Sequence, residues 1–233
     1  MISEKMWMLT SVFLFILLMF LFASQYNAQI TGKPFETKET VRLDFFAMSM
    51  CDHCVKFEPV IRDVVNLLQD NVIFRVYYVA FDREDGFWSM HGEREVEEDI
   101  RQLCVFEYYP DGFLDYVLCM GEDIGRVQDN WERCSEANGI DKEVIRECWQ
   151  GGEGEILFAE NIQKREYLGI TESPVLLINK HKYTGKRTKE ALKDWICDEF
   201  EIQPEECTLD LTERSLTAAI IGTPVEGTCK PEL

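Results

Sequence analysis

The sequence predicts an α/β fold whose core is interrupted by a cysteine-rich helical subdomain, and three observations lead to this prediction. Residues 41–81 carry a strand pattern, a helix pattern and a second strand pattern, which is typical of a βαβ unit. Residues 82–167 are charged, contain four cysteines and show helical spacing of their apolar side chains. Residues 168–200 return to strand-like stretches and one more helix. We therefore expect a domain formed by 41–81 and 168–200, into which 82–167 is inserted.

The first unit is expected to contain two buried strands joined by a helix. Val41 to Met48 is apolar and aromatic, and residues 72–81 are rich in β-branched and aromatic side chains, as strands are. Between them, apolar residues recur at helical spacing from Phe57 to Leu68, and Asn71 ends the pattern. A strand, a helix and a strand in this order predict parallel pairing with a right-handed crossover.

The second half of the domain is expected to complete the sheet and cover it. Strand-like stretches at residues 175–179 and 182–184 precede a helical pattern over 188–200. Thr188 is the expected N-cap of that helix, because threonine accepts hydrogen bonds from free backbone N–H groups. Residues 201–233 show no clear periodicity and are interpreted as a C-terminal tail.

An apolar run near the N-terminus predicts an export signal. Residues 7–22 are almost wholly apolar, a length between that of a signal-peptide core and that of a membrane-spanning helix. The small residues that follow fit a cleavage site poorly. Residues 1–28 are therefore expected to be a signal peptide or, slightly favoured, a signal anchor. Residues 29–40 are polar and are interpreted as a linker.

Charge and cysteine content narrow the class of protein. The formal net charge of −19 opposes binding to phosphate backbones, so no nucleic-acid partner is expected. Nine cysteines are typical of an oxidising compartment that permits structural disulfides. We therefore expect an extracytoplasmic protein, whether secreted, lumenal or at the cell surface, and attached to a membrane by residues 7–22 if that segment is kept.

The motif Cys51-Asp52-His53-Cys54 stands where the first strand ends and the helix begins. A thiol at this place lies near the helix N-terminus, whose unpaired N–H groups and dipole stabilise a thiolate. Cys51 is therefore expected to be the exposed attacking thiol, and Cys54, one turn inside, its resolving partner. A protonated His53 would lower the pKa of the Cys51 thiol and Asp52 would raise it, so the tuning by this pair partly cancels.

The motif has two other interpretations, half of a zinc site and a structural disulfide. A CxxC pair can form half of a zinc site, but zinc usually takes four ligands. The sequence has no second CxxC, and its only other histidines are His91 and His181. We therefore expect no metal and no other cofactor. A purely structural disulfide between Cys51 and Cys54 stays an alternative.

Asp44, Pro59 and the pair Ser173-Pro174, taken with the CxxC motif, resemble the thioredoxin superfamily. Pro59 lies five residues after the motif, the spacing at which thioredoxins kink their active-site helix. Asp44 resembles the acidic residue beneath the site that assists proton transfer, although it lies one residue further from the motif than in thioredoxin. Ser173-Pro174 resembles the cis-proline of the superfamily, which implies that the Ser173 backbone pairs with an extended substrate. The implied fold is thioredoxin-like.

The inserted subdomain resembles that of DsbA-like proteins and, in detail, the gamma-interferon-inducible lysosomal thiol reductase family. That family has a C-Q-H-G-x-x-x-C element. This chain keeps His91-Gly92 but has Ser89 and Val96 in place of the two cysteines, so one family disulfide is expected to be missing. His91 is expected to anchor the insertion rather than to catalyse. The resemblance also implies two structural disulfides among four further cysteines, with all three pairings open: Cys104, Cys119, Cys134 and Cys148.

Three cysteines remain near the C-terminus. A bridge between Cys197 and Cys207 would close a short loop after the last helix. Cys229 is then left over, either free or paired with another chain.

The resemblance implies a thiol–disulfide oxidoreductase that acts on protein thiols and disulfides. Oxidase or isomerase action on exported proteins is slightly favoured, with a membrane redox partner that could recharge the enzyme. Reduction, as in the lysosomal family, is the alternative direction. A different class, a non-catalytic module that holds extended clients in the groove, also stays open. A redox sensor or metal carrier is a weaker interpretation.

Overall fold

The computed structural model describes residues 15–19, 39–211 and 228–230. The chain divides into two units, Met1–Lys38 and Glu39–Leu233, and in the first of these only a short helix over residues 15–19 is described. Within the described residues no helix is both long and apolar enough to cross a membrane. The predicted signal segment over residues 7–22 lies largely outside the described residues.

The second unit is built on a four-stranded sheet, as the mixed α/β prediction requires. The strand order is β2-β1-β5-β6, formed by Val72–Tyr78, Val41–Ala47, Val175–Ile178 and His181–Lys182. The predicted parallel pairing of the first two strands is confirmed, with Val41 opposite Val72, and β5 lies antiparallel to β1 on its other side. The central strand β1 is therefore buried between neighbours, and it ends at Ala47, shortly before the CxxC motif.

The second predicted strand was too long at its C-terminal end. Strand β2 stops at Tyr78, and Phe81–Arg83 forms a separate strand β3, which pairs with β4, Gly86–Trp88, as an antiparallel hairpin. Gly86 has a φ of 118°, a backbone conformation that residues other than glycine rarely adopt. It therefore permits the tight turn between β3 and β4.

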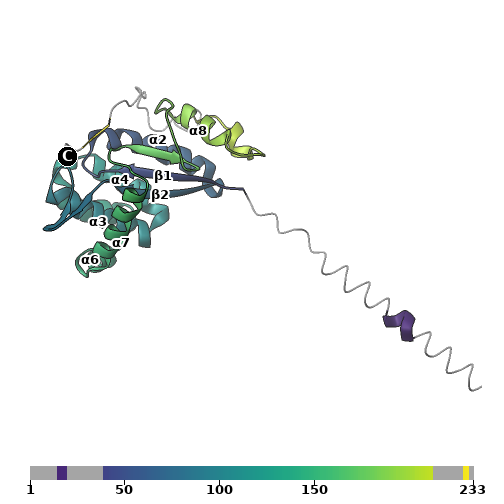
Figure 1. Ribbon diagram of the computed structural model, residues 1–233, viewed down its shortest axis with the longest axis horizontal. Helices are drawn as coiled ribbons and strands as arrows, with labels where there is room; N and C mark the ends of the chain where they lie inside the picture. Colours follow the sequence, from purple (N-terminus) through teal and green to yellow (C-terminus); the bar gives the residue numbers. More distant parts are fainter. Residues whose placement is uncertain (1–14, 20–38, 212–227, 231–233) are drawn as a thin grey trace, which may run out of the picture. The chain divides into compact units, whose positions relative to one another are not determined.

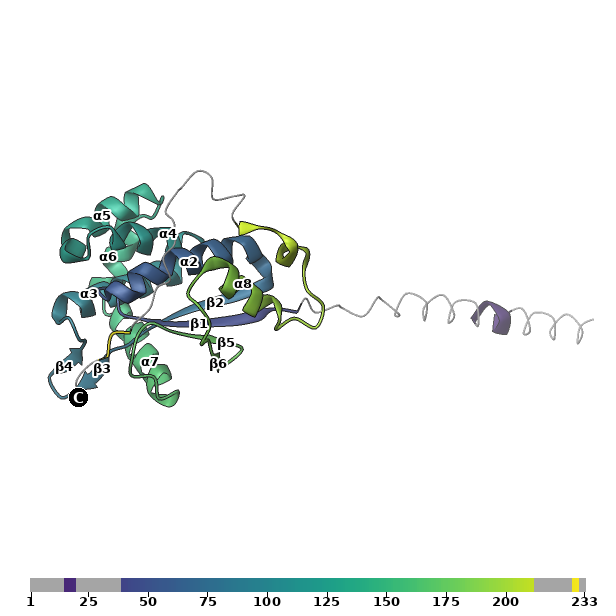
Figure 2. The same cartoon turned by 90° about the horizontal axis from the view of Figure 1, so that it is seen from above.

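Helices cover both faces of the sheet. Figure 2 shows α2, Asp52–Leu68, and α8, Lys189–Cys197, on one face and α7, Glu153–Tyr167, on the other. Helix α2 turns an apolar stripe that includes Phe57, Ile61 and Val64 into the core, which matches the predicted helical spacing. Its last turn is followed by a short 3₁₀ segment, Gln69–Asn71, close to the predicted end.

The inserted subdomain is a helical cluster (Figure 1). Its helices before α7 are α3, Glu93–Tyr108, α4, Pro110–Gly121, α5, Val127–Ala137, and α6, Lys142–Gln150.

Two disulfides hold this cluster together, and they resolve the pairing that the sequence left open. Cys104 bonds Cys148 and joins α3 to α6, while Cys119 bonds Cys134 and joins α4 to α5. Gly154 lets α7 approach α3 closely, since a Cβ there would lie 2.6 Å from the side chain of Ile100.

The end of helix α8 is tied to the segment that follows it. Thr188 caps the helix, as predicted, by accepting a hydrogen bond from the backbone N–H of Ala191 at 3.3 Å. Cys197 at the last turn bonds Cys207, which lies in the 3₁₀ segment Glu205–Thr208. The first part of the tail is therefore ordered.

Candidate active site

Cys51 lies at the N-terminus of helix α2. It is the N-cap residue, and its carbonyl oxygen accepts hydrogen bonds from the N–H of Cys54 at 2.9 Å and of Val55 at 3.1 Å. No side chain caps this helix end, so its first N–H groups are not satisfied by a side-chain acceptor. The Cys51 sulfur therefore sits in the positive field of the helix terminus, which favours a thiolate.

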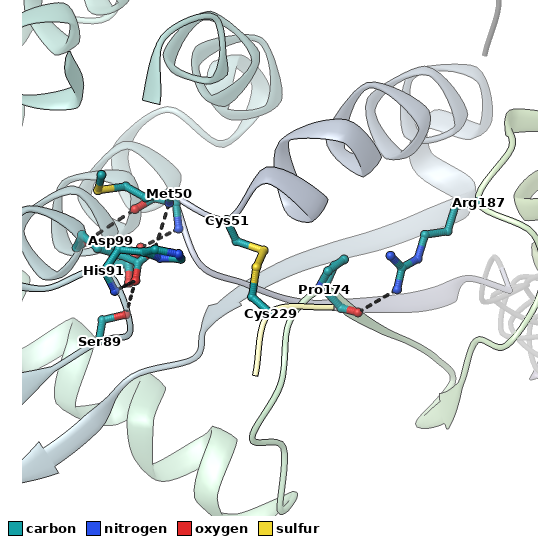
Figure 3. The surroundings of a disulfide bond; sticks show 10 residues. Met50, Cys51, Ser89, His91, Asp99, Pro174, Arg187 and Cys229 are labelled. Carbon is teal, nitrogen blue, oxygen red and sulfur yellow. Dashed lines mark hydrogen bonds and ion pairs between the residues drawn. A yellow bond between two sulfur atoms is a disulfide. The ribbon is translucent and has the colours of Figure 1, made fainter. Parts of the chain in front are cut away.

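The sulfur of Cys51 is bonded to Cys229 rather than to Cys54. The expectation that Cys229 is free or paired with another chain was therefore wrong. The expectation that Cys51 is exposed was wrong as well, because Cys51 is fully buried in this disulfide. Cys54 is also fully buried and is a free thiol. Three sulfur-bearing residues thus share one site, shown in part in Figure 3.

The peptide bond between Ser173 and Pro174 is cis, and it lies beside the Cys51 disulfide (Figure 3). The backbone N–H of Ser173 donates to the carbonyl oxygen of Cys229 at 2.8 Å, and the N–H of Cys229 donates back to the Ser173 carbonyl. This pair is an isolated antiparallel β-bridge. The Ser173 backbone therefore pairs with an extended segment, and that segment belongs to the chain's own tail.

Burial governs the chemistry of Cys54. It raises the pKa of the Cys54 thiol, and the negative charge of Glu58, one turn further along α2, raises it too. The Ser173 hydroxyl lowers that pKa, yet its oxygen has no hydrogen-bond partner of ordinary geometry within the described residues. Burial has the larger effect on the Cys54 pKa, because Cys54 has no exposed surface. Cys54 is therefore protonated at neutral pH while Cys51 is bonded to Cys229.

Glu58 and Arg187 are titratable groups that interact electrostatically with this buried thiol. Burial raises the pKa of Glu58 to about 8, so its carboxyl is mostly neutral at pH 7. The Arg187 guanidinium donates to the carbonyl oxygen of Pro174 at 3.2 Å and lies 5.3 Å from the ring centre of Phe57. Arg187 and Cys54 interact electrostatically, so the arginine would favour a Cys54 thiolate once it forms.

Two carboxyl groups from helix α3 fix the loop that precedes Cys51. The Met50 N–H donates to Glu95 Oε1, and the Ser49 N–H donates to Asp99 Oδ1, both at 3.0 Å. Both acidic side chains are fully buried. The inserted subdomain thus positions the loop that precedes Cys51.

His91 and Ser89 hold the charge of Glu95. The Ser89 hydroxyl donates to Glu95 Oε2 at 2.5 Å, and His91 Nδ1 lies 2.8 Å from Oε1. Burial acts to raise the pKa of Glu95, but these hydrogen bonds outweigh it and leave that pKa lowered. The hydrogen bond to Glu95 in turn raises the pKa of His91. Ser89, which occupies a cysteine position of the family element, therefore serves the same anchor as His91.

Solved structures with this architecture are oxidoreductases. Oxidised DsbA of Mycobacterium tuberculosis superposes with a TM-score of 0.58 and 15% identity, over 81% of this chain and 95% of that one. The reduced form of DsbG, from the same organism, gives 0.56 and 16% over 81% and 90%. The family model of gamma interferon inducible lysosomal thiol reductase matches residues 42–138. The chain has the thioredoxin-like fold of these solved structures. No curated protein matches its sequence significantly.

The structure places the other predicted site residues less centrally. Asp44 is buried on β1 and forms an ion pair with Arg42 at 2.8 Å, so its expected role in proton transfer stays a prediction. Asp52 is exposed. His53 is half-buried, and within the described part of the chain its Nδ1 has no hydrogen-bond partner.

The sequence analysis missed several groups of this candidate site. Glu58 had a local signal, since it is an acidic residue four positions after Cys54 on the apolar side of a helix. Glu95 and Asp99 had a weaker one, as carboxyl groups on the inward face of an amphipathic helix. Arg187 lies in a loop between β6 and α8 and had none.

The raised pKa of Glu58 predicts that the protein loses stability as the pH rises. A carboxyl group with an unfolded pKa of 4.5 and a folded pKa of about 8 binds more protons when folded, so the free energy of unfolding falls between those values. Glu58→Gln should remove this pH dependence, which in the wild type lowers the free energy of unfolding by roughly 4 kcal/mol between pH 5 and pH 8.5. Urea unfolding at pH 5 and pH 8.5 measures it, with Asp70→Asn, at an exposed position, as control. An unchanged slope in Glu58→Gln would contradict the assignment.

Glu95→Gln should weaken the anchor of the active-site loop in a defined pH window. The raised His91 pKa contributes stability below about 6.5, which is lost as the pH rises through the folded value. The lowered Glu95 pKa contributes above about 4.5, which is lost as the pH falls through the folded value. The stability difference between wild type and Glu95→Gln should therefore be largest between those pH values, about 1.5–3 kcal/mol.

Proton NMR gives a second measurement of the same anchor. In Glu95→Gln the His91 titration should move to lower pH, because the carboxylate that favours imidazolium is gone. The exposed His181 is an internal control whose signals should not change. A His91 titration that is the same in both proteins would refute the pairing.

Proposed function

We propose that the protein is a thiol–disulfide oxidoreductase that exchanges disulfides with extended segments of exported proteins, with Cys51 as the attacking thiol and Cys54 as the resolving thiol. In this proposal Ser173 and Pro174 form the substrate-binding backbone. The observation that carries it is the segment around Cys229, which is bonded to Cys51 and paired with the Ser173 backbone at the same time. A client cysteine in an extended chain would have the same two interactions.

The favoured direction is oxidation or isomerisation of client thiols. A client thiolate attacks the Cys51 sulfur of a Cys51–Cys54 disulfide, the S–S bond breaks, and Cys54 leaves as a thiolate that takes up a proton. A second client thiolate then attacks the client sulfur of the mixed disulfide, and Cys51 leaves as a thiolate. Two electrons pass from the client to the enzyme.

The burial of Cys54 supports this direction. A thiol with a raised pKa is seldom a thiolate, so it attacks the mixed disulfide slowly. The client's own second thiol then has time to attack, which completes oxidation or isomerisation. The reduced enzyme would need reoxidation, for which a membrane redox partner is the proposed class.

A specific observation favours the second candidate, reduction of client disulfides. The matching family model describes a thiol reductase, and the match includes the CxxC motif. In this direction the Cys51 thiolate attacks the client disulfide, and Cys54 then releases the client as a thiol while Cys51–Cys54 forms.

The disulfides support a proposal about the compartment in which the protein works. The described residues contain four disulfides, which persist in oxidising compartments. We propose an extracytoplasmic location, with residues 1–28 as signal peptide or anchor.

The reduction potential of the Cys51–Cys54 pair decides between the two directions. Equilibration of Cys229→Ser with glutathione buffers, followed by acid quench and mass spectrometry, isolates this couple from the tail cysteine. We expect a value well above that of thioredoxin, in the range of oxidants and isomerases. A potential near roughly −270 mV would refute the oxidase proposal and favour reduction.

A further inference from the structure

The segment around Cys229 occupies the place of a substrate. It makes a two-way backbone bridge to Ser173, directly before the cis peptide bond, and its sulfur is bonded to that of Cys51. Figure 3 shows Cys229 reaching Cys51 beside Pro174. The two cysteines are 178 residues apart in sequence, so this contact joins the tail to the first helix of the domain.

The Cys51–Cys229 bond differs from the other three disulfides. Those three join neighbouring structural elements, and none involves a residue of the CxxC motif. The Cys51–Cys229 bond involves the sulfur at the N-terminus of helix α2. It leaves Cys54, three residues away, as a buried free thiol. Cys51 thus has two sulfur partners available and can bond only one of them.

We propose that Cys229 is an internal substrate cysteine, which forms a reversible mixed disulfide with Cys51 and thereby occupies the substrate strand site until a client or Cys54 displaces it. This inference rests on the proposed function, since it assigns Cys51 as the nucleophile and Ser173 as the strand that binds clients. It adds a third redox-active cysteine to the site.

The exchange needs no oxidant or reductant. Cys54 loses its proton, and its thiolate attacks the Cys51 sulfur; the Cys51–Cys54 bond forms as the Cys51–Cys229 bond breaks. Cys229 leaves as a thiolate and takes up a proton. One disulfide and one thiol are present before and after, so electrons and protons balance. The buried, protonated state of Cys54 makes this step slow at low pH and faster as the pH rises.

The tail would compete with clients at an advantage. A tethered segment meets its site at an effective concentration of about the millimolar range when its linker can span the distance. When a client thiol at micromolar concentration displaces Cys229, the tethered Cys229 thiolate therefore returns to Cys51 more often than the client is processed, and most of the enzyme stays in the Cys51–Cys229 form. The tail acts as a built-in brake that strong or abundant clients overcome.

Disulfide mapping of the full-length protein tests the bond. The protein is equilibrated in glutathione buffers, quenched with acid and digested, and the cross-linked peptides are measured. We expect both Cys51–Cys229 and Cys51–Cys54 peptides, in a ratio that changes with pH, and in Cys54→Ser we expect Cys51–Cys229 alone. Absence of the Cys51–Cys229 peptide would overturn the inference. So would a Cys51–Cys229 bond that never exchanges, because it would then be structural.

Rates of oxidation of a dithiol reporter peptide by the oxidised enzyme test the brake. After brief equilibration in the same buffer, Cys229→Ser should react through Cys51 at least about tenfold faster than wild type at micromolar peptide. A matched control moves the thiol by one position, with Thr228→Cys and Cys229→Thr combined, which keeps the composition but turns the sulfur to the other side of the strand. This control should be as fast as Cys229→Ser.

The two proposals fail in different ways. Equal reporter rates in wild type and Cys229→Ser, with Cys51→Ser inactive, would overturn the internal substrate and leave the proposed function intact. Full turnover in Cys51→Ser would overturn the proposed function itself.

Discussion

Cys51→Ser is expected to reduce disulfide exchange to the uncatalysed rate while the protein keeps its fold. The hydroxyl of serine is a far weaker nucleophile than a thiolate, and the helix terminus at α2 activates only the sulfur. Three disulfides outside the motif remain in this variant and hold the inserted subdomain and the end of α8. Turnover of a fluorogenic disulfide peptide measures the loss, and circular dichroism checks the fold.

Cys229→Ser is the matched control for this experiment. Both variants lose the Cys51–Cys229 bond, but only Cys51→Ser loses the nucleophile. An inactive Cys51→Ser beside an active Cys229→Ser assigns the chemistry to Cys51. If Cys51→Ser still protected or bound clients with full function, the non-catalytic client-binding module would replace the enzyme proposal. In wild type after mild reduction, Cys51 should also be alkylated faster than an ordinary surface thiol.

The parts of the fold that the sequence predicted are those with local signals. A βαβ pattern, an apolar helix face and an N-cap threonine are each written within one segment, and β1, α2, β2 and Thr188 appear where those patterns lie. The CxxC motif falls at the junction of a strand and a helix for the same reason. The error at Phe81 arose because apolar side chains continue past Tyr78, whereas the backbone turns into the hairpin β3–β4 there.

The cysteine pairing and the covering of Cys51 depend on contacts that no local pattern records. Whether Cys104 bonds Cys148 or another cysteine is decided by how α3 packs on α6, and several helix arrangements fit the same amphipathic patterns. The disulfide partner of Cys51 is Cys229, which lies in a tail whose apolar residues show no periodic pattern. The sequence could count an odd cysteine at position 229, but it could not place that cysteine beside Ser173.

Arg101→Ala should destabilise the protein by about 3–5 kcal/mol, the largest stability effect that we expect from one substitution. Arg101 on α3 is 1% exposed and forms an ion pair with Glu98, which is fully buried. Its guanidinium also lies 4.2 Å from the ring centre of Trp149 and 5.1 Å from that of Trp131, so it binds α6 and α5 to α3. Removing it leaves a buried carboxyl without its cation and a cavity among three helices.

The neighbours of Glu98 do not replace the lost charge. Gln102 donates to Glu98 Oε1 at 2.9 Å and Tyr116 donates at 3.4 Å, but both groups are neutral. In Arg101→Ala we therefore expect Glu98 to become protonated, so that the loss of stability is smaller at pH 4 than at pH 7. Thermal unfolding should show a decrease of about 10 °C or more in Tm at pH 7.

The exposed Arg133, which pairs with the exposed Glu122 at 3.3 Å, supplies the matched control. Arg133→Ala should change stability by less than about 0.5 kcal/mol, because water screens its ion pair. The combined Arg101→Leu and Glu98→Leu variant should lose less stability than Arg101→Ala, since it buries no unpaired charge. A double variant as unstable as the sum of its single changes would show that shape, and not the buried charge, determines the cost.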